Sequence, residues 1–159
     1  MFLNKKKILL LIIICSIFFL FTYNDVKSYE IKIIDGDTIY LNNEKIRFTG
    51  IDTPELKQTC NKNNEIIYCG IEARQLLIDK IGKDKVICVR EGKDQYKRTL
   101  AECFVNDLSL SRFLVREGYA FAYRKYSKKF INDEDFARKN NIGMWSMKFE
   151  YPWDWRKKN

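Results

Sequence analysis

The chain has 159 residues and a formal net charge of +8, because 29 lysine and arginine residues outnumber 21 aspartate and glutamate residues. It contains no histidine. This absence excludes imidazole metal sites, Ser-His-Asp and Cys-His nucleophiles, and any histidine general base. Carboxylates and arginines are therefore the side chains to which catalytic roles can be assigned.

Residues 1–28 have the pattern of a secretory signal peptide. Three lysines at positions 5 to 7 precede an apolar run of fourteen residues, Ile8–Phe21. This run is shorter than the roughly 20 residues that a membrane-spanning helix needs. We expect cleavage after Ser28, export to a periplasm or the medium, and no stable membrane association afterwards. An uncleaved N-terminal anchor is the alternative.

Removal of residues 1–28 leaves 131 residues, enough for one compact domain and its own core. The signal contributes four lysines and one aspartate, so the remaining chain keeps a charge of +5. We expect a monomer with one domain over residues 29–148 and an aromatic and basic tail over residues 149–159. The surplus of positive charge favours a polyanionic partner. Ordinary solubility charge explains it equally well.

Four cysteines remain once Cys15 leaves with the signal, and an even number in a small exported domain predicts disulfide bonds. Cys88 and Cys103 lie on two β-type runs that flank a turn, so they can face each other across a hairpin. Cys60 then pairs with Cys69. The same register sets Arg90 opposite Ala101.

The chain from residue 29 to residue 81 predicts a meander of three strands, a loop and one helix. Turn-forming pairs, Asp35-Gly36 and Asn42-Asn43, separate the strands. Apolar residues at helical spacing before Gly82 predict the helix. The expected ranges are Tyr29–Ile34, Thr38–Leu41 and Lys45–Ile51 for the strands, Leu56–Tyr68 for the loop and Gly70–Ile81 for the helix.

The rest of the chain predicts two strands, Val86–Arg90 and Thr99–Val105, and two helices. The first of these helices has Asp107 or Ser109 as its candidate N-cap and ends at Gly118. The second has Asn132 as its candidate N-cap, an acidic first turn, and an end before Gly143.

This arrangement of elements predicts a β-rich α+β fold. Five strands with one helix between the third and the fourth are typical of a five-stranded OB-fold barrel, here with three α-helices. Such barrels commonly bind oligonucleotides.

Three acidic residues and two arginines carry the strongest chemical signal. Asp37 lies in Asp-Gly-Asp-Thr, and Asp52 and Glu55 lie in Asp-Thr-Pro-Glu, five residues after Arg47; Arg98 ends Asp-Gln-Tyr-Lys-Arg. Carboxylate oxygens favour Ca²⁺ or Mg²⁺, and each guanidinium can bind two phosphate oxygens. Together these residues predict phosphodiester cleavage, although each motif alone is also an ordinary turn or surface pair.

In this order the motifs resemble the staphylococcal nuclease, or thermonuclease, family, from about Glu30 to Trp145. Further matching segments are Cys69-Gly70-Ile71-Glu72-Ala73, Leu114-Val115-Arg116-Glu117-Gly118 and Gly143-Met144-Trp145. The sequence departs from the family pattern at Gln95, at Lys97 and in the cysteine-containing loop after Glu55. The tail lies beyond the resemblance.

The resemblance implies a Ca²⁺-dependent nuclease acting on DNA and RNA with little sequence preference, leaving 3′-phosphate and 5′-hydroxyl ends. It implies that the Asp37 and Asp52 side chains and the Thr53 carbonyl bind Ca²⁺. Glu55 orients or deprotonates the attacking water; in the rival interpretation it is a third ligand. It implies that Arg47 and Arg98 bind the scissile phosphate. It also implies that Tyr96 and Tyr123 contact the terminal phosphate and the base.

Aromatic and basic residues alternate between Tyr119 and Lys128, which suits base stacking beside a phosphate backbone. We expect Tyr123 to be exposed for stacking and Phe121 to be buried. Trp153 and Trp155 are more typical of a tail held against the domain. The alternatives to a nuclease are a catalytically inactive OB-fold module that binds nucleic acid and a tethered protein that binds anionic lipid.

Overall fold

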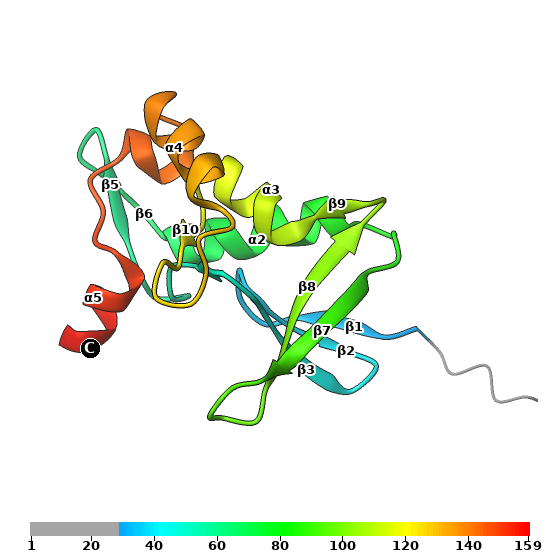
Figure 1. The fold of residues 1–159 in the computed structure, drawn as a ribbon. Helices are drawn as coiled ribbons and strands as arrows, with labels where there is room; N and C mark the ends of the chain where they lie inside the picture. The colour runs from blue at the N-terminus through cyan, green and yellow to red at the C-terminus, as the bar shows by residue number, and fades with distance from the viewer. Residues whose placement is uncertain (1–28) are drawn as a thin grey trace, which may run out of the picture.

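The computed structural model describes residues 29–159, so the expected signal peptide lies outside the described residues (Figure 1). A six-stranded sheet forms one part of the molecule, and helices pack along one side of it (Figure 1). The fold is therefore mixed α+β, as the sequence predicts.

All five predicted strands are present in the main sheet, whose order is β1-β2-β3-β8-β7, with β9 added on β8. Neighbours are antiparallel except β3 and β8, which run parallel. Among residues 29–159 the strand pairing does not join β1 to β7, so the path is open and not the closed barrel that the sequence suggested. The strands of this sheet are β1 (Ile31–Ile33), β2 (Thr38–Leu41), β3 (Glu44–Phe48), β7 (Ile87–Lys93), β8 (Thr99–Val105) and β9 (Leu108–Ser109).

Three hairpins turn through pairs of residues with left-handed backbone. Asn42 and Asn43, with φ of 50° and 66°, join β2 to β3, and Asn106 and Asp107 join β8 to β9 in the same way. Two consecutive positive φ angles match the twist of the flanking strands, and asparagine and aspartate tolerate them. Asparagine and aspartate therefore favour the two-residue turns that set the register of these hairpins.

The third such hairpin lies where the sequence predicted only a loop. Within Leu56–Tyr68, β5 (Cys60–Lys62) and β6 (Glu65–Ile67) pair across Asn63 and Asn64, whose φ angles are 52° and 70°. The loop prediction was wrong because these strands are only three residues long each and carry no alternating apolar pattern.

Four α-helices occur within residues 29–159, one more than expected. Ser109 caps α3, because its Oγ accepts a hydrogen bond from the Arg112 amide at 3.2 Å. The Asn132 cap was wrong: Asn132 lies inside α4, which follows Phe130. The helices are α2 (Cys69–Ile81), α3 (Leu110–Arg116), α4 (Ile131–Lys139) and α5 (Pro152–Lys158), with a 3₁₀ turn η1 (Gly143–Ser146).

The unexpected helix, α5, forms in the C-terminal tail. Pro152 occupies its first turn, where a missing amide hydrogen costs nothing, and three basic residues close its last turn. No helix in the described part of the chain is long and apolar enough to cross a bilayer.

Two clusters form the core. The larger lies between the sheet and helices α2 and α3 and includes Ile39, Phe48, Leu77 and Leu114. The smaller is centred on Phe121, which is fully buried as predicted. Between them β4 (Ile51–Asp52) pairs with β10 (Phe121–Ala122).

Both predicted disulfides are present. Cys88 and Cys103 face each other across β7 and β8 with 4.0 Å between their Cα atoms, and Arg90 lies opposite Ala101. Cys60 is bonded to Cys69, which ties the β5–β6 hairpin to the first residue of α2. Each bond closes a loop within one region of the domain, at sequence separations of 15 and 9.

We expect replacement of Cys88 and Cys103 by serine to lower the free energy of unfolding by about 3 kcal/mol, because the unfolded chain regains the entropy of the open loop. The matching replacement of Cys60 and Cys69 should cost slightly less, since its loop is shorter. Urea unfolding of the three proteins measures both values. Equal stability of the Cys88–Cys103 variant and the parent would contradict this prediction.

Candidate active site

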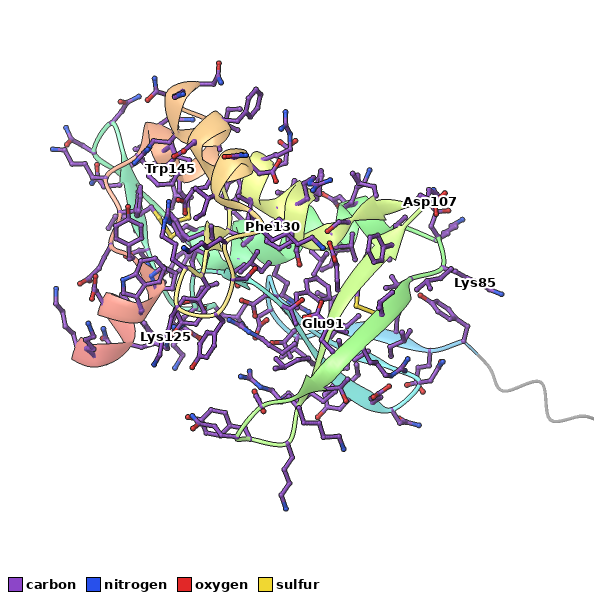
Figure 2. All side chains as sticks on the ribbon, in the orientation of Figure 1. Lys85, Glu91, Asp107, Lys125, Phe130 and Trp145 are labelled. Atoms are coloured by element: carbon purple, nitrogen blue, oxygen red, sulfur yellow. A yellow bond between two sulfur atoms is a disulfide. The ribbon has the colours of Figure 1, made fainter. Side chains whose placement is uncertain are left out.

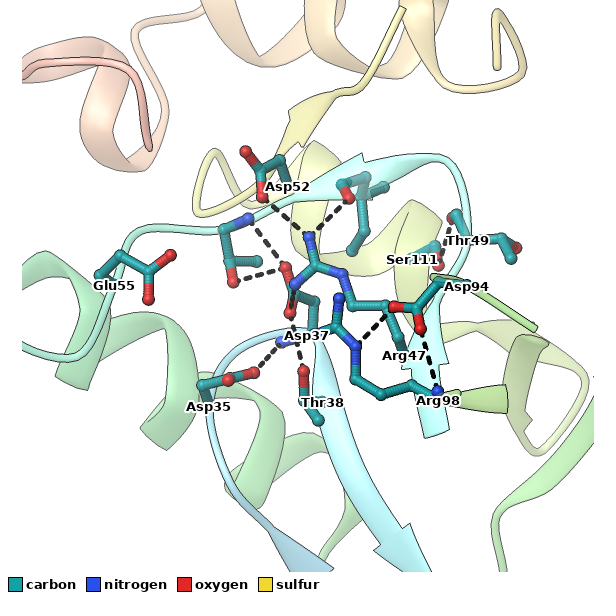
Figure 3. A network of polar contacts seen from close by, with 12 residues as sticks. Asp35, Asp37, Thr38, Arg47, Thr49, Asp52, Glu55, Asp94, Arg98 and Ser111 are labelled. Atoms are coloured by element: carbon teal, nitrogen blue, oxygen red, sulfur yellow. Dashed lines mark hydrogen bonds and ion pairs between the residues drawn. The ribbon is translucent and has the colours of Figure 1, made fainter. Parts of the chain in front are cut away.

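Two fully buried carboxylates and one arginine form the centre of the site (Figure 3). Asp37 directly precedes β2, and Asp52 ends β4. Arg47 lies on β3 opposite Thr38, so its side chain reaches both acids. Its Nη1 forms an ion pair with Asp37 Oδ1, and its Nη2 lies 2.8 Å from Asp52 Oδ1. The structure therefore brings the two predicted metal ligands to opposite sides of one guanidinium.

The second oxygen of Asp37 is held by Thr53. Asp37 Oδ2 accepts hydrogen bonds from the Thr53 amide at 3.0 Å and from Thr53 Oγ1 at 2.9 Å, while Thr38 Oγ1 donates to Oδ1 at 3.2 Å. A buried charge is tolerated when it is paired and hydrogen-bonded in this way. These bonds fix Thr53, the third predicted ligand, beside Asp37.

Asp35 is part of the same network, although the sequence indicated only a turn. Its Oδ1 accepts a hydrogen bond from the Asp37 amide at 3.1 Å, which orients Asp37. Burial raises the pKa of Asp35, and the nearby Arg47 only partly offsets this effect. The Asx-turn tendency of Asp-Gly was the available signal.

Arg98 lies next to Arg47 (Figure 3). Its Nε lies 2.6 Å from Asp94 Oδ2, and Asp94 Oδ1 accepts from the Tyr96 and Arg98 amides, so the β7–β8 turn holds its own arginine. Burial opposes ionisation of Asp94, but the bonds from Arg98 outweigh it and lower the pKa of Asp94.

Burial lowers the pKa of Arg47, its carboxylate partners oppose this, and repulsion from Arg98 lowers it further. Two adjacent guanidiniums form a site that an anion stabilises. The two arginines that we expected to clamp a phosphate therefore lie side by side.

Glu55 lies to one side of this centre (Figure 3). Its side chain is 40% exposed, whereas its backbone is fixed: the amide donates to Gln58 Oε1 at 3.2 Å. A Cβ at Gly70 would come within 1.9 Å of the Glu55 carbonyl oxygen, so only glycine allows this contact with α2. Among residues 29–159, no three acidic side chains converge closely enough to share a metal ion.

Arg156 of α5 is a site residue that the sequence did not indicate. Its Nη2 lies 2.6 Å from Asp52 Oδ2, and its Nη1 lies 2.8 Å from Glu55 Oε1. Burial lowers the pKa of Arg156, but the hydrogen bonds that Arg156 donates to Asp52 and Glu55 outweigh it, so the pKa lies above its ordinary value. These contacts span about a hundred residues of sequence, and no local pattern reveals them.

The two predicted substrate tyrosines have different surroundings. Tyr96 is 71% exposed at the tip of the β7–β8 hairpin, with the Arg98 guanidinium 5.6 Å from its ring centre. Tyr123 is only half-buried, and its ring stacks on Trp153 at 6.1 Å with an interplanar angle of 9°. Trp153 of the tail therefore covers part of the Tyr123 ring, which we expected to be exposed for stacking.

The donor set suits a hard cation. Asp37 and Asp52 offer carboxylate oxygens, and no hydrogen bond reaches the Thr53 carbonyl oxygen within the described chain. No softer nitrogen or sulfur ligand lies in this group, since both disulfides occupy the described cysteines.

We expect Arg47→Gln to lower the free energy of unfolding at pH 7 by on the order of 3 kcal/mol, because two buried carboxylates lose a shared counter-charge. Lys45→Gln, an exposed position on the same strand, is the matched control. Urea denaturation measures both. A midpoint for Arg47→Gln that equals that of the control would show that Arg47 does not stabilise the buried pair.

The chain is similar in sequence to known proteins. Residues 45–147 match the family model described as "Staphylococcal nuclease homologue". The chain is 30% identical over 151 residues to "Micrococcal nuclease" of Shigella flexneri, covering 84% of this chain and 82% of that protein. It is 29% identical over 148 residues to "Uncharacterized endonuclease" of Haemophilus influenzae, covering 85% and 78% of the two chains.

A plant relative is longer than this chain. "Probable staphylococcal-like nuclease CAN2" of Oryza sativa is 32% identical over 136 residues, which cover 84% of this chain. The chain spans about a third of that protein's length, since the match covers 34% of it. The family model, however, covers well over half of the present chain. The chain therefore belongs to the staphylococcal nuclease family.

Proposed function

We propose that this protein is an exported, monomeric, Ca²⁺-dependent nuclease that hydrolyses DNA and RNA with little sequence preference. Its family makes nuclease activity the general function, with nucleic acid as the substrate. The observation that carries the finer proposal is the placement of Arg47 and Arg98 side by side, next to the buried Asp37 and Asp52. This combination suits a phosphodiester, which repels nucleophiles through its own negative charge.

Asp37, Asp52 and the Thr53 carbonyl would hold the Ca²⁺. When bound there, the ion supplies positive charge to both carboxylates and withdraws electron density from the phosphate. The strand order β1-β2-β3-β8-β7, with β3 and β8 parallel, supports an OB-type scaffold for this site.

The arginines bind the phosphate and stabilise the charge that grows on it during attack. Each guanidinium can donate two parallel hydrogen bonds to phosphate oxygens. Arg98 keeps its orientation through Asp94, and Arg47 through Asp52. Such preorganised donors contribute most when charge develops in the transition state.

Glu55 accepts a proton from the attacking water as its oxygen bonds to phosphorus. The bond from phosphorus to the 5′ oxygen breaks, and that oxygen takes up a proton from solvent. The products are a 3′-phosphate and a 5′-hydroxyl. The partly exposed position of Glu55 supports this role, because water reaches its carboxylate while its backbone stays fixed.

Recognition would depend on the nucleic acid backbone and not on base identity. The arginines contact phosphate, and exposed Tyr96 beside Arg98 suits the terminal phosphate. Tyr123 and Trp153 would together form the aromatic stack that contacts the base. Export is supported by the pattern of residues 1–28 and by the two disulfides, which persist in oxidising compartments.

We expect the purified protein to cleave an end-labelled oligonucleotide with Ca²⁺ and to lose this activity when a chelator removes the metal. Mg²⁺ in place of Ca²⁺ tests which ion the site accepts. End-group analysis should find 3′-phosphates. Binding of the oligonucleotide without cleavage under all conditions would favour the alternative, an inactive OB-fold binding module.

We expect Arg98→Ala to slow turnover about a hundred- to a thousandfold, because one preorganised phosphate donor is lost. The fold should survive, since Arg98 lies in an exposed hairpin. Lys93→Ala removes a positive charge from the same hairpin and is the control. Full activity of Arg98→Ala would remove this residue from the clamp.

A further inference from the structure

The C-terminal tail reaches the active site from outside the segment that the family model matches. Helix α5 stands apart from α2, α3 and α4, at the opposite end of the molecule from β9 (Figure 1). From this helix Arg156 contacts Asp52 with both terminal nitrogens, at 2.6 and 3.2 Å, and Glu55 with one, at 2.8 Å. One guanidinium thus bridges a buried acid and an exposed one.

The tail is held in this position by contacts other than those of Arg156. The fully buried Gln58 accepts from the Glu55 amide and donates to the Glu150 carbonyl at 2.7 Å. Lys148 and Asn61 exchange two backbone hydrogen bonds of 2.8 Å each. The same glutamine therefore fixes both the turn that carries Glu55 and the segment that leads into α5.

Aromatic packing secures the beginning of the helix. The Trp153 ring stacks on the Tyr151 ring, with 4.6 Å between the ring centres and an interplanar angle of 10°. It also stacks on the Tyr123 ring, with 6.1 Å between the ring centres and an angle of 9°. Phe121 makes edge contacts with Tyr151 and Trp153. In Figure 2, side chains fill the space between α5 and the neighbouring part of the domain. The backbone that presents Arg156 is consequently ordered by burial and stacking.

Arg156 is the partner of the Glu55 carboxylate. Within residues 29–159, no other side chain forms a hydrogen bond or ion pair with this carboxylate. Without this partner, a side chain that is 40% exposed would change between several rotamers. The arginine fork ties it to Asp52, which is itself fixed by Arg47.

We propose that Arg156 is a positioning residue for cleavage, which holds the Glu55 carboxylate beside Asp52 so that Glu55 meets the attacking water in one orientation. The inference rests on the proposed function, because it assigns Arg156 a role through the proposed base. It extends the working site to the tail, and it makes α5 necessary for turnover and not only for stability.

The test compares Arg156→Gln and Arg156→Lys with Lys157→Gln, which removes the same charge from the next, exposed residue of α5. Oligonucleotide cleavage is measured at saturating Ca²⁺, so changes in metal affinity do not enter kcat. We expect Arg156→Gln to lower kcat at least about tenfold with KM within about threefold, because a misplaced base loses part of its hundred- to ten-thousandfold contribution. Lysine should restore part of the rate, and Lys157→Gln should retain it.

A double-mutant cycle identifies the residue through which Arg156 acts. If it acts by positioning Glu55, Arg156→Gln should change kcat less than about twofold once Glu55→Gln is present, because the positioned group is already gone. Thermal unfolding of all variants measures folding separately. A merely structural arginine would slow both backgrounds equally.

The outcomes separate this inference from the proposed function. A parent protein that cleaves nothing overturns both. With an active parent, the inference alone fails if Arg156→Gln keeps full kcat, changes only KM, or slows the Glu55→Gln background as much as the parent. It also fails if Arg156→Gln turns over faster than the parent, because Arg156 would then be a block that substrate displaces.

Discussion

The ion pairs from Arg47 to Asp37 and Asp52 are the interactions on which the site depends. The two acids come from separate strand ends, and each is fully buried. Burying two like charges near each other is unfavourable unless a counter-charge lies between them. Strand β3 supplies it, because pairing of Arg47 with Thr38 sets the guanidinium beside Asp37. The register of the β2–β3 hairpin, fixed by two asparagines, is therefore a condition for the chemistry.

The same network compensates the negative charge of the acids at the site. Asp35, Asp37 and Asp52 are turned inward onto arginine or backbone donors, and Asp94 is engaged by Arg98. Their charge is compensated inside the protein. The guanidiniums of Arg47 and Arg98 lie next to each other in this network, which fits the nucleic acid substrate that we propose.

Much of the fold follows from short-range pattern. The five main strands, the first helix, both disulfides and the burial of Phe121 were all predictable, because alternation, turn residues and hairpin register act over a few positions. The β5–β6 hairpin has little apolar pattern, so its only sequence signal was the turn-forming pair Asn63 and Asn64. Helix α5 and the contacts of Arg156 with Asp52 and Glu55 were not predicted from the sequence, because these contacts join positions about a hundred residues apart.

The glycine at position 70 has a consequence for how this protein can lose activity. A single added methyl group there would collide with the Glu55 carbonyl. The neighbouring residue, Cys69, is held by its bond to Cys60 and cannot yield easily. The displacement would therefore fall on the turn that carries Glu55, while the sheet with Asp37 and Arg47 stays in place. With Glu55 as the base that we propose, a substitution at position 70 would disturb the chemistry through this turn.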